Sequence, residues 1–448
     1  MPPDDAMRHS AKIISGKTWD QILVLNPLIN MDSYPGWHAI LGFFYNITKC
    51  DALGLVLFSM ISLFALFSVT PLFFLRYPEA WLMSLVTLAI LTPGFIFRLF
   101  LGRPFIFTIF CLLIILFSWP ALNSRKINHK IAVALILLIA ASFWIHASWY
   151  FYIFLITVFF LARKWRAAIT LGVCWPIGTM LGAMATGHPI LFIKQEITHL
   201  FLVFGQNEAS GFLVSELRSA FIDSAVIMII LAMLGWRALR GKWNNKVVDN
   251  PVFICVVLSL VLGFFTRRFT LDWGIPALAV WMSQEFEGFL GDSVGAFSLR
   301  RIPLVIILSA VLFISVTADA GGRWSSWKPV DYLSEEDPDQ AGWLPEAGGI
   351  IYSNDMGVFY STFFKNPRAN WRYILGFESG FMPPEDLKIY RNIQKNPATY
   401  GPFLAWVKKM KPEDRLIIRG APGNSPRIPG LEWYYAARGT WVGRLPGR

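Results

Sequence analysis

Charge is scarce in this sequence. Only 15% of its 448 residues are charged, whereas 55% are hydrophobic. A soluble domain contains about 25% charged residues and a smaller apolar fraction. The composition therefore excludes an ordinary soluble globular protein. Aromatic residues, at 16%, suit helices that face lipid and its interfaces, so we predict an integral membrane protein.

Paired cysteines and a signal peptide are also missing. The four cysteines form no C-x-x-C pair, and Cys111, Cys174 and Cys255 lie inside apolar runs. A disulfide framework and a cysteine-held metal site are therefore disfavoured. Residues 1–49 lack the apolar core of a signal peptide. We expect that the first span is its own insertion signal or that an upstream helix is missing from this chain.

The net charge of +11 does not indicate a nucleic-acid partner. The basic residues lie mainly in short loops between apolar runs, where the positive-inside rule places them. Alternate loops carry most of the lysine and arginine, which predicts that both termini lie outside. We therefore expect the lipid bilayer as partner, a bacterial inner membrane as location, and a periplasmic C-terminal domain.

Hydrophobic runs divide the first three quarters of the chain into about ten expected spans, since a span needs about 20 apolar residues. The fold expected is a mainly α, polytopic transmembrane bundle. The run from Ile131 to Ala162 is divided near His146, with one long tilted helix as the alternative. The spans are expected at residues 52–75, 79–97, 104–119, 131–145, 148–162, 167–185, 221–238, 250–265, 271–283 and 301–316.

The apolar runs end near Asp319, and a different pattern follows. Short strand-like segments alternate with helical patterns, which predicts a small α/β domain outside the membrane. The strands are expected at Gly349–Ser353, Trp371–Leu375 and Arg415–Arg419, and the helices at Pro384–Lys395 and Tyr400–Lys409. The expected domains are an outer segment at 1–51, a transmembrane domain at 52–318 and a soluble domain at 319–448.

The predicted outer face collects carboxylates, histidines and arginines. Carboxylates and histidines bind hard divalent cations or act as general bases, and arginines pair with phosphate oxygens. Together they favour a reaction on a phosphate-linked lipid. The residues are Asp4, Asp5, Arg8, His9, Asp32, His38, Arg98, Arg103, His146, Arg267 and Arg268.

Most of these residues also have a simpler explanation. Asp4 and Asp5 can be solvated charges near a terminus, and Asp32 can shape a turn. Arg98 and Arg103 can be anchors that reach toward the interface from a helix end. His38 and His146 can be packed, hydrogen-bonded histidines. The pair Arg267-Arg268 is harder to explain in this way, because cations are disfavoured on that side.

Several short motifs resemble the GT-C superfamily of polytopic glycosyltransferases, which use polyprenyl-phosphate-linked sugars. Asp4-Asp5-Ala6-Met7-Arg8-His9 fits the pattern D-[DE]-x-x-R-[YH] of the first outer loop in that superfamily. The stretch Asp32–His38, the element Arg103-Pro104-Phe105, the His146 region and the tail from Gly349 to Tyr390 are similar to further parts of such proteins. Members have a helix before the acidic loop, whereas this chain begins at that loop.

The resemblance implies a glycosyltransferase that moves a sugar from a polyprenyl-phosphate donor to an envelope glycan, lipid or protein at the periplasmic face. Asp5 or Asp4 would act as general base, and Asp32 with His38 would form a second catalytic or metal-binding cluster for Mg²⁺ or Mn²⁺. Arginines and His146 would bind the substrate. We also expect the amphipathic stretch Ile190–Phe204 to lie along the outer interface.

Two other functions stay open. One is a non-catalytic GT-C-like scaffold or accessory subunit that works with envelope-assembly proteins. The other is a transporter, which is less favoured because the sequence shows no inverted repeat and no matched pair of broken helices.

Overall fold

The computed structural model describes residues 5–29, 31–125, 128–204, 224–241, 247–293, 301–318, 333–436 and 439–447. The chain divides into two compact units. The first comprises Met1–Ser59, Ile190–Val214 and Trp324–Arg448, and the second comprises Met60–Pro189 and Ser215–Arg323. Each unit is described by itself. The domain boundaries expected at residues 51 and 318 stay predictions.

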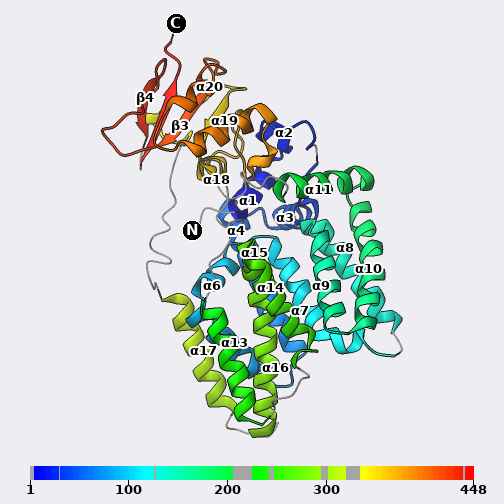
Figure 1. Ribbon diagram of the computed structural model, residues 1–448. Helices are drawn as coiled ribbons and strands as arrows, with labels where there is room; N and C mark the ends of the chain where they lie inside the picture. The colour runs from blue at the N-terminus through cyan, green and yellow to red at the C-terminus, as the bar shows by residue number, and fades with distance from the viewer. Residues whose placement is uncertain are drawn as a thin grey trace. The chain divides into compact units, whose positions relative to one another are not determined.

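The first unit combines N-terminal helices, one later helix and an α/β fold (Figure 1). Its helices outside the α/β part are α1 (Asp5–Ser15), α2 (Trp19–Ile22), α3 (Pro35–Thr48) and α11 (Pro189–Phe204). The α/β part contains β1 (Ile350–Ser353), α18 (Met356–Lys365), β2 (Arg372–Tyr373), α19 (Pro384–Lys395), α20 (Leu404–Val407), β3 (Arg415–Arg419), β4 (Glu432–Ala436) and β5 (Thr440–Arg444).

The five strands form one mixed sheet in the order β2-β1-β3-β5-β4. The first three are parallel, and β5 is antiparallel to both β3 and β4. Tyr352 and Leu416 are register partners, and both pack with Trp406 against the face that α19 and α20 cover. Phe359 of α18 contacts Tyr373 of β2, with ring centroids 5.2 Å apart. Since side chains alternate along a strand, α18 covers the opposite face.

The sequence-based expectations for this part of the chain hold for three strands and one helix. The segments β1, β2 and β3 lie where strand patterns were expected, and α19 has the expected bounds. The helix expected at Tyr400–Lys409 is wrong in detail. It is a 3₁₀ turn, η8 (Gly401–Phe403), followed by the short α20. Pro402 supplies no backbone N–H, which suits a turn start better than a helix interior.

The N-terminal segment is bound to the edge of this sheet. The Val24 amide donates to the Tyr373 carbonyl at 3.0 Å, next to a parallel bridge between Leu23 and Tyr373. The Asn26 amide donates to the Phe381 carbonyl at 2.7 Å. Residues near the two ends of the sequence therefore belong to one folded body.

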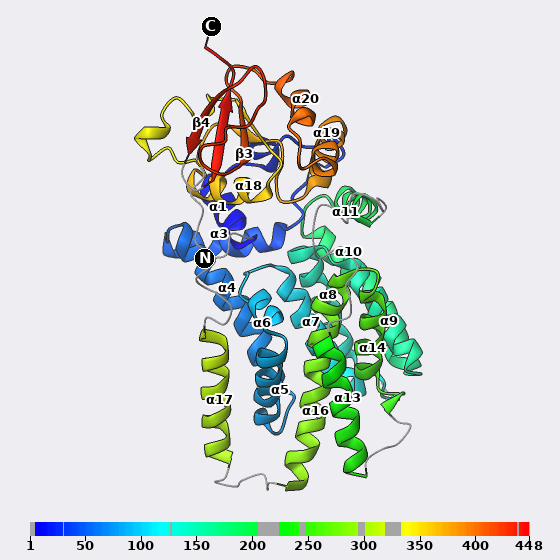
Figure 2. The ribbon, with the colours of Figure 1, turned by 60° about the vertical axis from the view of Figure 1, so that its left-hand side comes forward.

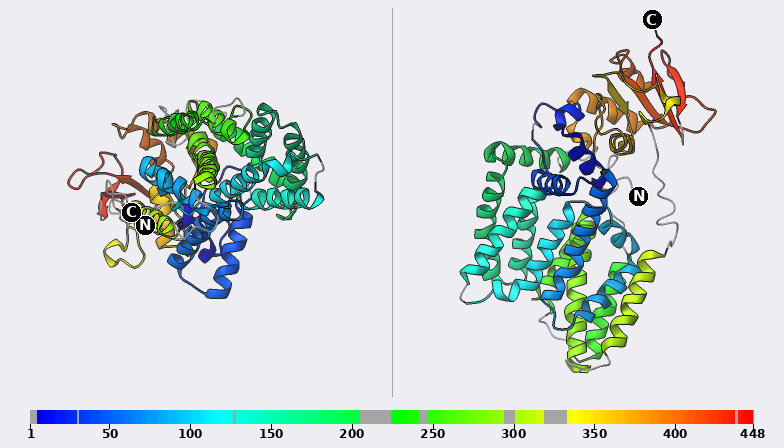
Figure 3. Two further views of the ribbon diagram at one scale, coloured as in Figure 1. Left: turned by 90° about the horizontal axis from the view of Figure 1, so that it is seen from below. Right: turned by 180° about the vertical axis from the view of Figure 1, so that it is seen from behind.

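The second unit is built of helices. Figure 2 shows α5, α13, α16 and α17 beside one another, and Figure 3 gives two further views of the ribbon. The helices are α5 (Pro78–Leu91), α6 (Pro93–Leu99), α7 (Phe105–Leu122), α8 (His129–His146), α9 (Trp149–Leu161), α10 (Trp165–Met184), α13 (Ser224–Leu239), α14 (Pro251–Gly263), α15 (Arg267–Phe269), α16 (Ile275–Ser293) and α17 (Arg301–Thr317). The boundary between the units falls within α4 (Ala52–Val69).

Every expected hydrophobic segment contains a helix, but the count of about ten spans is not confirmed. Among the described residues, four helices are long and apolar enough to cross a membrane, namely Ala52–Phe73, Phe105–Leu122, His129–His146 and Trp165–Met184. The segment expected as one span at 79–97 is two helices, α5 and α6. The break falls before Pro93, because proline disfavours helical backbone in the residue that precedes it.

Helices α8 and α10 pack so closely that only glycine fits at two positions. A Cβ on Gly182 would lie 2.4 Å from the carbonyl oxygen of Ala140, and one on Gly178 would lie 2.8 Å from that of Ile136. Small residues at helix interfaces allow such close backbone approach in membrane proteins. The close packing of α8 against α10 therefore depends on these two glycines.

We expect Gly182→Ala to lower the thermal stability of the purified protein, because the new methyl group forces the two backbones apart. Overpacking of this kind costs about 1–3 kcal/mol. Gly172→Ala on the same helix is the matched control, since its Cβ would meet only Ile156 Cδ1 at 4.0 Å. Melting curves of both variants test this. Equal melting temperatures for the two variants would show that the close contact is not needed.

Candidate functional site

The site in the first unit begins at helix α1, which carries an ion pair on its first turns. The Arg8 Nε donates to Asp5 Oδ1 at 2.8 Å, one helical turn apart. Arg8 is 1% exposed, so its charge lies inside the protein. The Asp5 side chain is 19% exposed. Asp5 therefore offers a carboxylate near the surface, while Arg8 stays beneath it.

Aromatic rings complete the surroundings of the buried guanidinium. Its carbon lies 3.8 Å from the centroid of the Phe377 ring and 4.7 Å from that of the Tyr34 ring. Burial alone would lower the pKa of Arg8. The charge and hydrogen bond of Asp5, together with smaller contributions from Tyr34 and Tyr360, outweigh burial, and the pKa lies above its usual value. Arg8 therefore stays charged, and cation–π contacts help to stabilise it there.

Asp32 is the second carboxylate of the site and lies in the loop before α3. Its Oδ1 accepts hydrogen bonds from the Tyr34 amide at 3.0 Å and the Trp19 indole at 3.2 Å, and its Oδ2 pairs with His38 Nδ1. Burial by itself raises the pKa of this carboxyl. The His38 partner and the two other donors outweigh burial and hold the pKa of Asp32 well below its usual range. Asp32 is therefore ionised.

A series of hydrogen bonds leads from Asp32 through two histidines into the interior of the unit. His38 Nε2 and His9 Nδ1 lie 2.7 Å apart, and both residues are buried. Because ionised Asp32 can only accept, His38 Nδ1 carries a proton. In neutral His38 the Nε2 is then an acceptor, so His9 donates from Nδ1. An added proton would be shared between two imidazoles beside a carboxylate.

The C-terminal part of the chain also reaches this cluster. The Tyr360 hydroxyl of α18 donates to Asp5 Oδ1 at 3.3 Å. The Phe377 ring lies near those of Trp19 and Tyr34, tilted against the first and edge-on to the second, with centroids 4.9 and 6.3 Å away. We call Asp5, Arg8, His9, Asp32 and His38 the histidine cluster. It is assembled from α1, the loop before α3 and α3 itself, and Tyr360 and Phe377 contact it.

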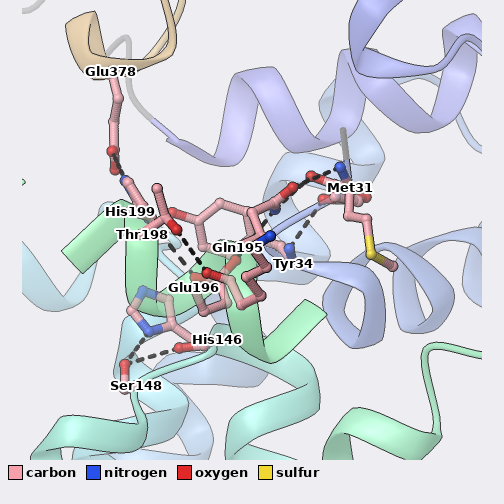
Figure 4. A network of polar contacts seen from close by, with 11 residues as sticks. Met31, Tyr34, His146, Ser148, Gln195, Glu196, Thr198, His199 and Glu378 are labelled. Carbon is pink, nitrogen blue, oxygen red and sulfur yellow. Dashed lines mark hydrogen bonds and ion pairs between the residues drawn. The ribbon is translucent and has the colours of Figure 1, made fainter. Parts of the chain in front are cut away.

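Helix α11 forms a polar network with the same unit (Figure 4). Gln195 exchanges two hydrogen bonds with the backbone of Met31, at 2.8 and 3.0 Å, and so fixes the residue before Asp32. His199 pairs with Glu378, and its Nδ1 lies 3.7 Å from Glu196 Oε2. The amphipathic stretch 190–204 is helical, and its place at the membrane interface stays a prediction.

A second cluster lies in the second unit, around a buried carboxylate. Asp272 is 0% exposed and sits in η4 (Thr270–Gly274), a π-helical turn between α15 and α16. Arg98 Nε donates to its Oδ1 at 2.6 Å, and Arg268 Nε donates to its Oδ2 at 2.9 Å. Single π turns inside helices are frequent at functional sites. We call Arg98, Arg268 and Asp272 the arginine cluster.

Two of the expected residues of this unit, Arg268 and His146, contact Phe105. The Arg268 guanidinium carbon lies 5.1 Å from the centroid of the Phe105 ring, and the His146 ring packs edge-on against it, also at 5.1 Å. His146 ends α8 and bonds to Ser148, as Figure 4 shows. Arg103 lies two residues before Phe105, and its carbonyl accepts from Ile106 N at 2.9 Å.

The structure thus places most of the expected residues in two groups. Arg267, by contrast, is exposed. Asp4 lies outside the described residues. Asp272 was missed, although a lone carboxylate in an apolar segment is itself a signal of function. Tyr34, Tyr360 and Glu378 were missed as well, because no local pattern distinguishes them.

A divalent cation was expected on Asp32 and His38, and the observed geometry does not fit one. Both ring nitrogens of His38 are engaged, one with Asp32 and the other with His9. Within the described ranges, no three His, Cys, Asp or Glu side chains form a group that could hold a metal ion. A cation at His38 would first have to displace one of these hydrogen bonds. The reaction proposed for this site therefore has no step that uses a metal ion.

Comparison with known proteins finds likenesses to solved structures, among them two of an archaeal oligosaccharyltransferase. No protein-family model matches the chain, and no curated protein gives a significant match. The crystal structure of the oligosaccharyltransferase from Archaeoglobus fulgidus in the apo form has a TM-score of 0.46 and 12% identity, over 93% of this chain and 66% of that one. The archaeal oligosaccharyltransferase AglB from Archaeoglobus fulgidus, in complex with an inhibitory peptide and a dolichol-phosphate, has a TM-score of 0.49 and 12% identity, over 99% and 70%. The chain spans about two thirds of the length of the first of these.

The His199 network predicts a dependence of stability on pH. Burial lowers the pKa of His199, but the charges of Glu378 and Glu196 and their hydrogen bonds outweigh it and raise the pKa to about 10. A histidine in the unfolded protein has a pKa of about 6.5. The stabilisation is therefore complete below that pH and is lost as the pH rises toward about 10.

Melting temperatures of the wild type and of His199→Gln, measured between those two pH values, test this. We expect the wild type to lose stability over the range and His199→Gln to lose less. His188→Gln is the control, because His188 is exposed. Parallel curves for the wild type and His199→Gln would contradict the assignment of a charged His199.

Proposed function

We propose that this chain is a membrane glycosyltransferase of the GT-C type, which moves a sugar from a polyprenyl-phosphate donor to an envelope acceptor. The observation that carries the proposal is the histidine cluster. It gathers two carboxylates, two hydrogen-bonded imidazoles and a buried guanidinium in one place. Groups with strongly perturbed pKa values cluster at functional sites. These residues are also the ones whose motifs resemble the acidic outer loop of that superfamily.

The reaction requires a base at the acceptor. In an inverting transfer, the acceptor hydroxyl oxygen attacks the anomeric carbon, the bond from that carbon to the phosphate oxygen breaks, and polyprenyl phosphate leaves. The hydroxyl proton passes to a base. We assign this role to Asp5, because its carboxylate is partly exposed whereas His9 and His38 are buried. Arg8 and Tyr360 fix its orientation through their hydrogen bonds.

The hydrogen-bonded imidazoles of His9 and His38 are proposed to take up the proton that the base removes from the acceptor. Asp5 and His9 are four residues apart on α1 and therefore lie on the same helix face. A proton that enters the chain of His9 and His38 forms an imidazolium next to ionised Asp32, which stabilises it by a charge-assisted hydrogen bond. Asp32 and His38 are therefore proposed as the second catalytic group.

The arginine cluster suits the phosphate of the donor. Two guanidinium groups share one carboxylate, so the cluster carries a net charge of +2 − 1 = +1. Asp272 orients both groups before any ligand arrives, and pre-oriented cations stabilise charge that develops on a leaving group. Guanidinium groups also match pairs of phosphate oxygens in geometry. Arg103, Arg267 and His146 are proposed as further substrate contacts.

The membrane setting of the proposal follows from the sequence. The distribution of lysine and arginine favours both termini outside, so the histidine cluster and the α/β part would face the periplasm of a bacterial inner membrane. The donor would then be a sugar on undecaprenyl phosphate or a similar lipid. The acceptor would be an envelope glycan, lipid or protein.

One observation favours a non-catalytic scaffold as the alternative. Arg8 is almost fully buried, and Asp5 is its ion-pair partner, so Asp5 can be explained as a structural counter-charge. Removing one partner of a buried pair costs about 3–5 kcal/mol. A scaffold therefore predicts a large loss of stability in Asp5→Asn, with no activity to lose.

The enzyme proposal predicts that Asp5→Asn lowers turnover about 10²–10⁴-fold, the usual contribution of a positioned base. Asp20→Asn is the matched control, because Asp20 is an exposed carboxylate on the neighbouring α2. The measurement is release of polyprenyl phosphate from a panel of undecaprenyl-phosphate sugars by the purified protein, with melting curves alongside. Wild-type turnover in a folded Asp5→Asn would exclude Asp5 as the base. A wild-type protein that releases nothing from any donor would favour the scaffold.

A further inference from the structure

A pocket of about 460 Å³ lies in the α/β part of the first unit, and no residue of the histidine cluster lines it. It opens where the parallel strands β1 and β3 end and where α18 begins. Ligands of α/β sheets bind outside the carboxyl ends of the strands, and this volume falls in the range of small-molecule sites. Its lining includes Asn354, Asp355, Tyr390, Gln394, Tyr400 and Arg419.

The lining combines an aromatic side with a polar one. Tyr400 is 37% exposed, and its ring lies near that of Phe403, with centroids 6.4 Å apart. The polar side offers a carboxylate, an amide and a guanidinium, from Asp355, Gln394 and Arg419. Gln394 Nε2 is directed at the carbonyl of Asn354, at 3.1 Å. An apolar surface with a few converging polar groups is typical of a ligand site.

The charges of the pocket select among ligands. Asp355 and Arg419 form an ion pair, so their charges balance. Asp355 also caps α18, because its Oδ1 accepts from the Gly357 amide at 2.8 Å. A phosphate would therefore meet a carboxylate at the helix end that would otherwise attract it. The pocket thus disfavours nucleotides and phosphorylated ligands and favours an uncharged one.

We propose that this pocket binds a neutral sugar residue, a hexose or an N-acetylhexosamine. One face of the sugar ring stacks on Tyr400. The hydroxyl groups donate to the Asp355 carboxylate and accept from Arg419 and Gln394, since a hydroxyl can do both. The site does not rest on the proposed glycosyl transfer, because no residue of either cluster lines it.

Helix α18 nevertheless connects the pocket with the histidine cluster. Asp355 caps its first turn, and Tyr360 on the same helix donates to Asp5. Five residues of helix rise correspond to roughly 7.5 Å along the axis. A sugar bound at the start of α18 would therefore contact the same helix whose Tyr360 donates to the proposed base, Asp5.

Binding to the full-length protein tests the proposal directly. The probes are glucose, galactose, mannose, N-acetylglucosamine and N-acetylgalactosamine, followed by ligand-observed NMR. The protein is kept in a detergent without sugar, because alkyl maltosides carry the ligand class under test. We expect saturable binding of at least one probe. Tyr400→Ala should weaken it about tenfold or more, the cost of removing an aromatic anchor, and Gln394→Ala should weaken it as well.

Two variants serve as controls. Tyr400→Phe keeps the ring and should bind within about twofold of the wild type. Lys388→Ala alters an exposed residue of α19 that does not line the pocket, so binding should not change. Melting curves establish that each variant is folded. The proposal is overturned if no probe binds the wild type, if the folded pocket variants bind as well as Lys388→Ala, or if uridine diphosphate binds at the pocket in preference to the sugars.

Discussion

A single buried charge, on Arg8, constrains the arrangement of the first unit. An isolated cation inside a protein is very costly, so it must have a counter-charge and polarisable neighbours. Asp5 supplies the charge, and the rings of Tyr34 and Phe377 cover the guanidinium. These groups come from α1, from the loop before α3 and from the C-terminal part of the chain. Their positions are therefore set together, and the loop that contains Asp32 is fixed as a result.

The same physical requirement shapes the second unit with the signs reversed. There the buried group is the carboxylate of Asp272, and two arginines approach it from α6 and from α15. The carboxylate cannot be left unpaired at 0% exposure, and the arginines gain a fixed orientation in return. In both units a charge taken out of water organises the groups around it.

The hydrophobic segments of the sequence predict the helices well, because each run is apolar over a helical length. The strands β1 and β3 follow from short apolar runs between turn residues. Helix α18 was missed, since its sequence, MGVFYSTFFK, is rich in aromatic and β-branched residues. The site was predicted only as a set of residue types on one expected face. Its pairings join residues that are far apart in sequence, 29 positions for His9 and His38 and 174 for Arg98 and Asp272, and no local pattern encodes them.

The central claim is that Asp32 and His38 act as one proton-carrying unit in glycosyl transfer. Residues that act as a unit show strongly non-additive losses when they are replaced singly and together. The most direct measurement is a double-mutant cycle on turnover, with Asp32→Asn, His38→Gln and the double variant. The account predicts that each single variant loses nearly all the activity that the double variant loses. Losses that multiply, or single variants that retain wild-type turnover, would contradict it.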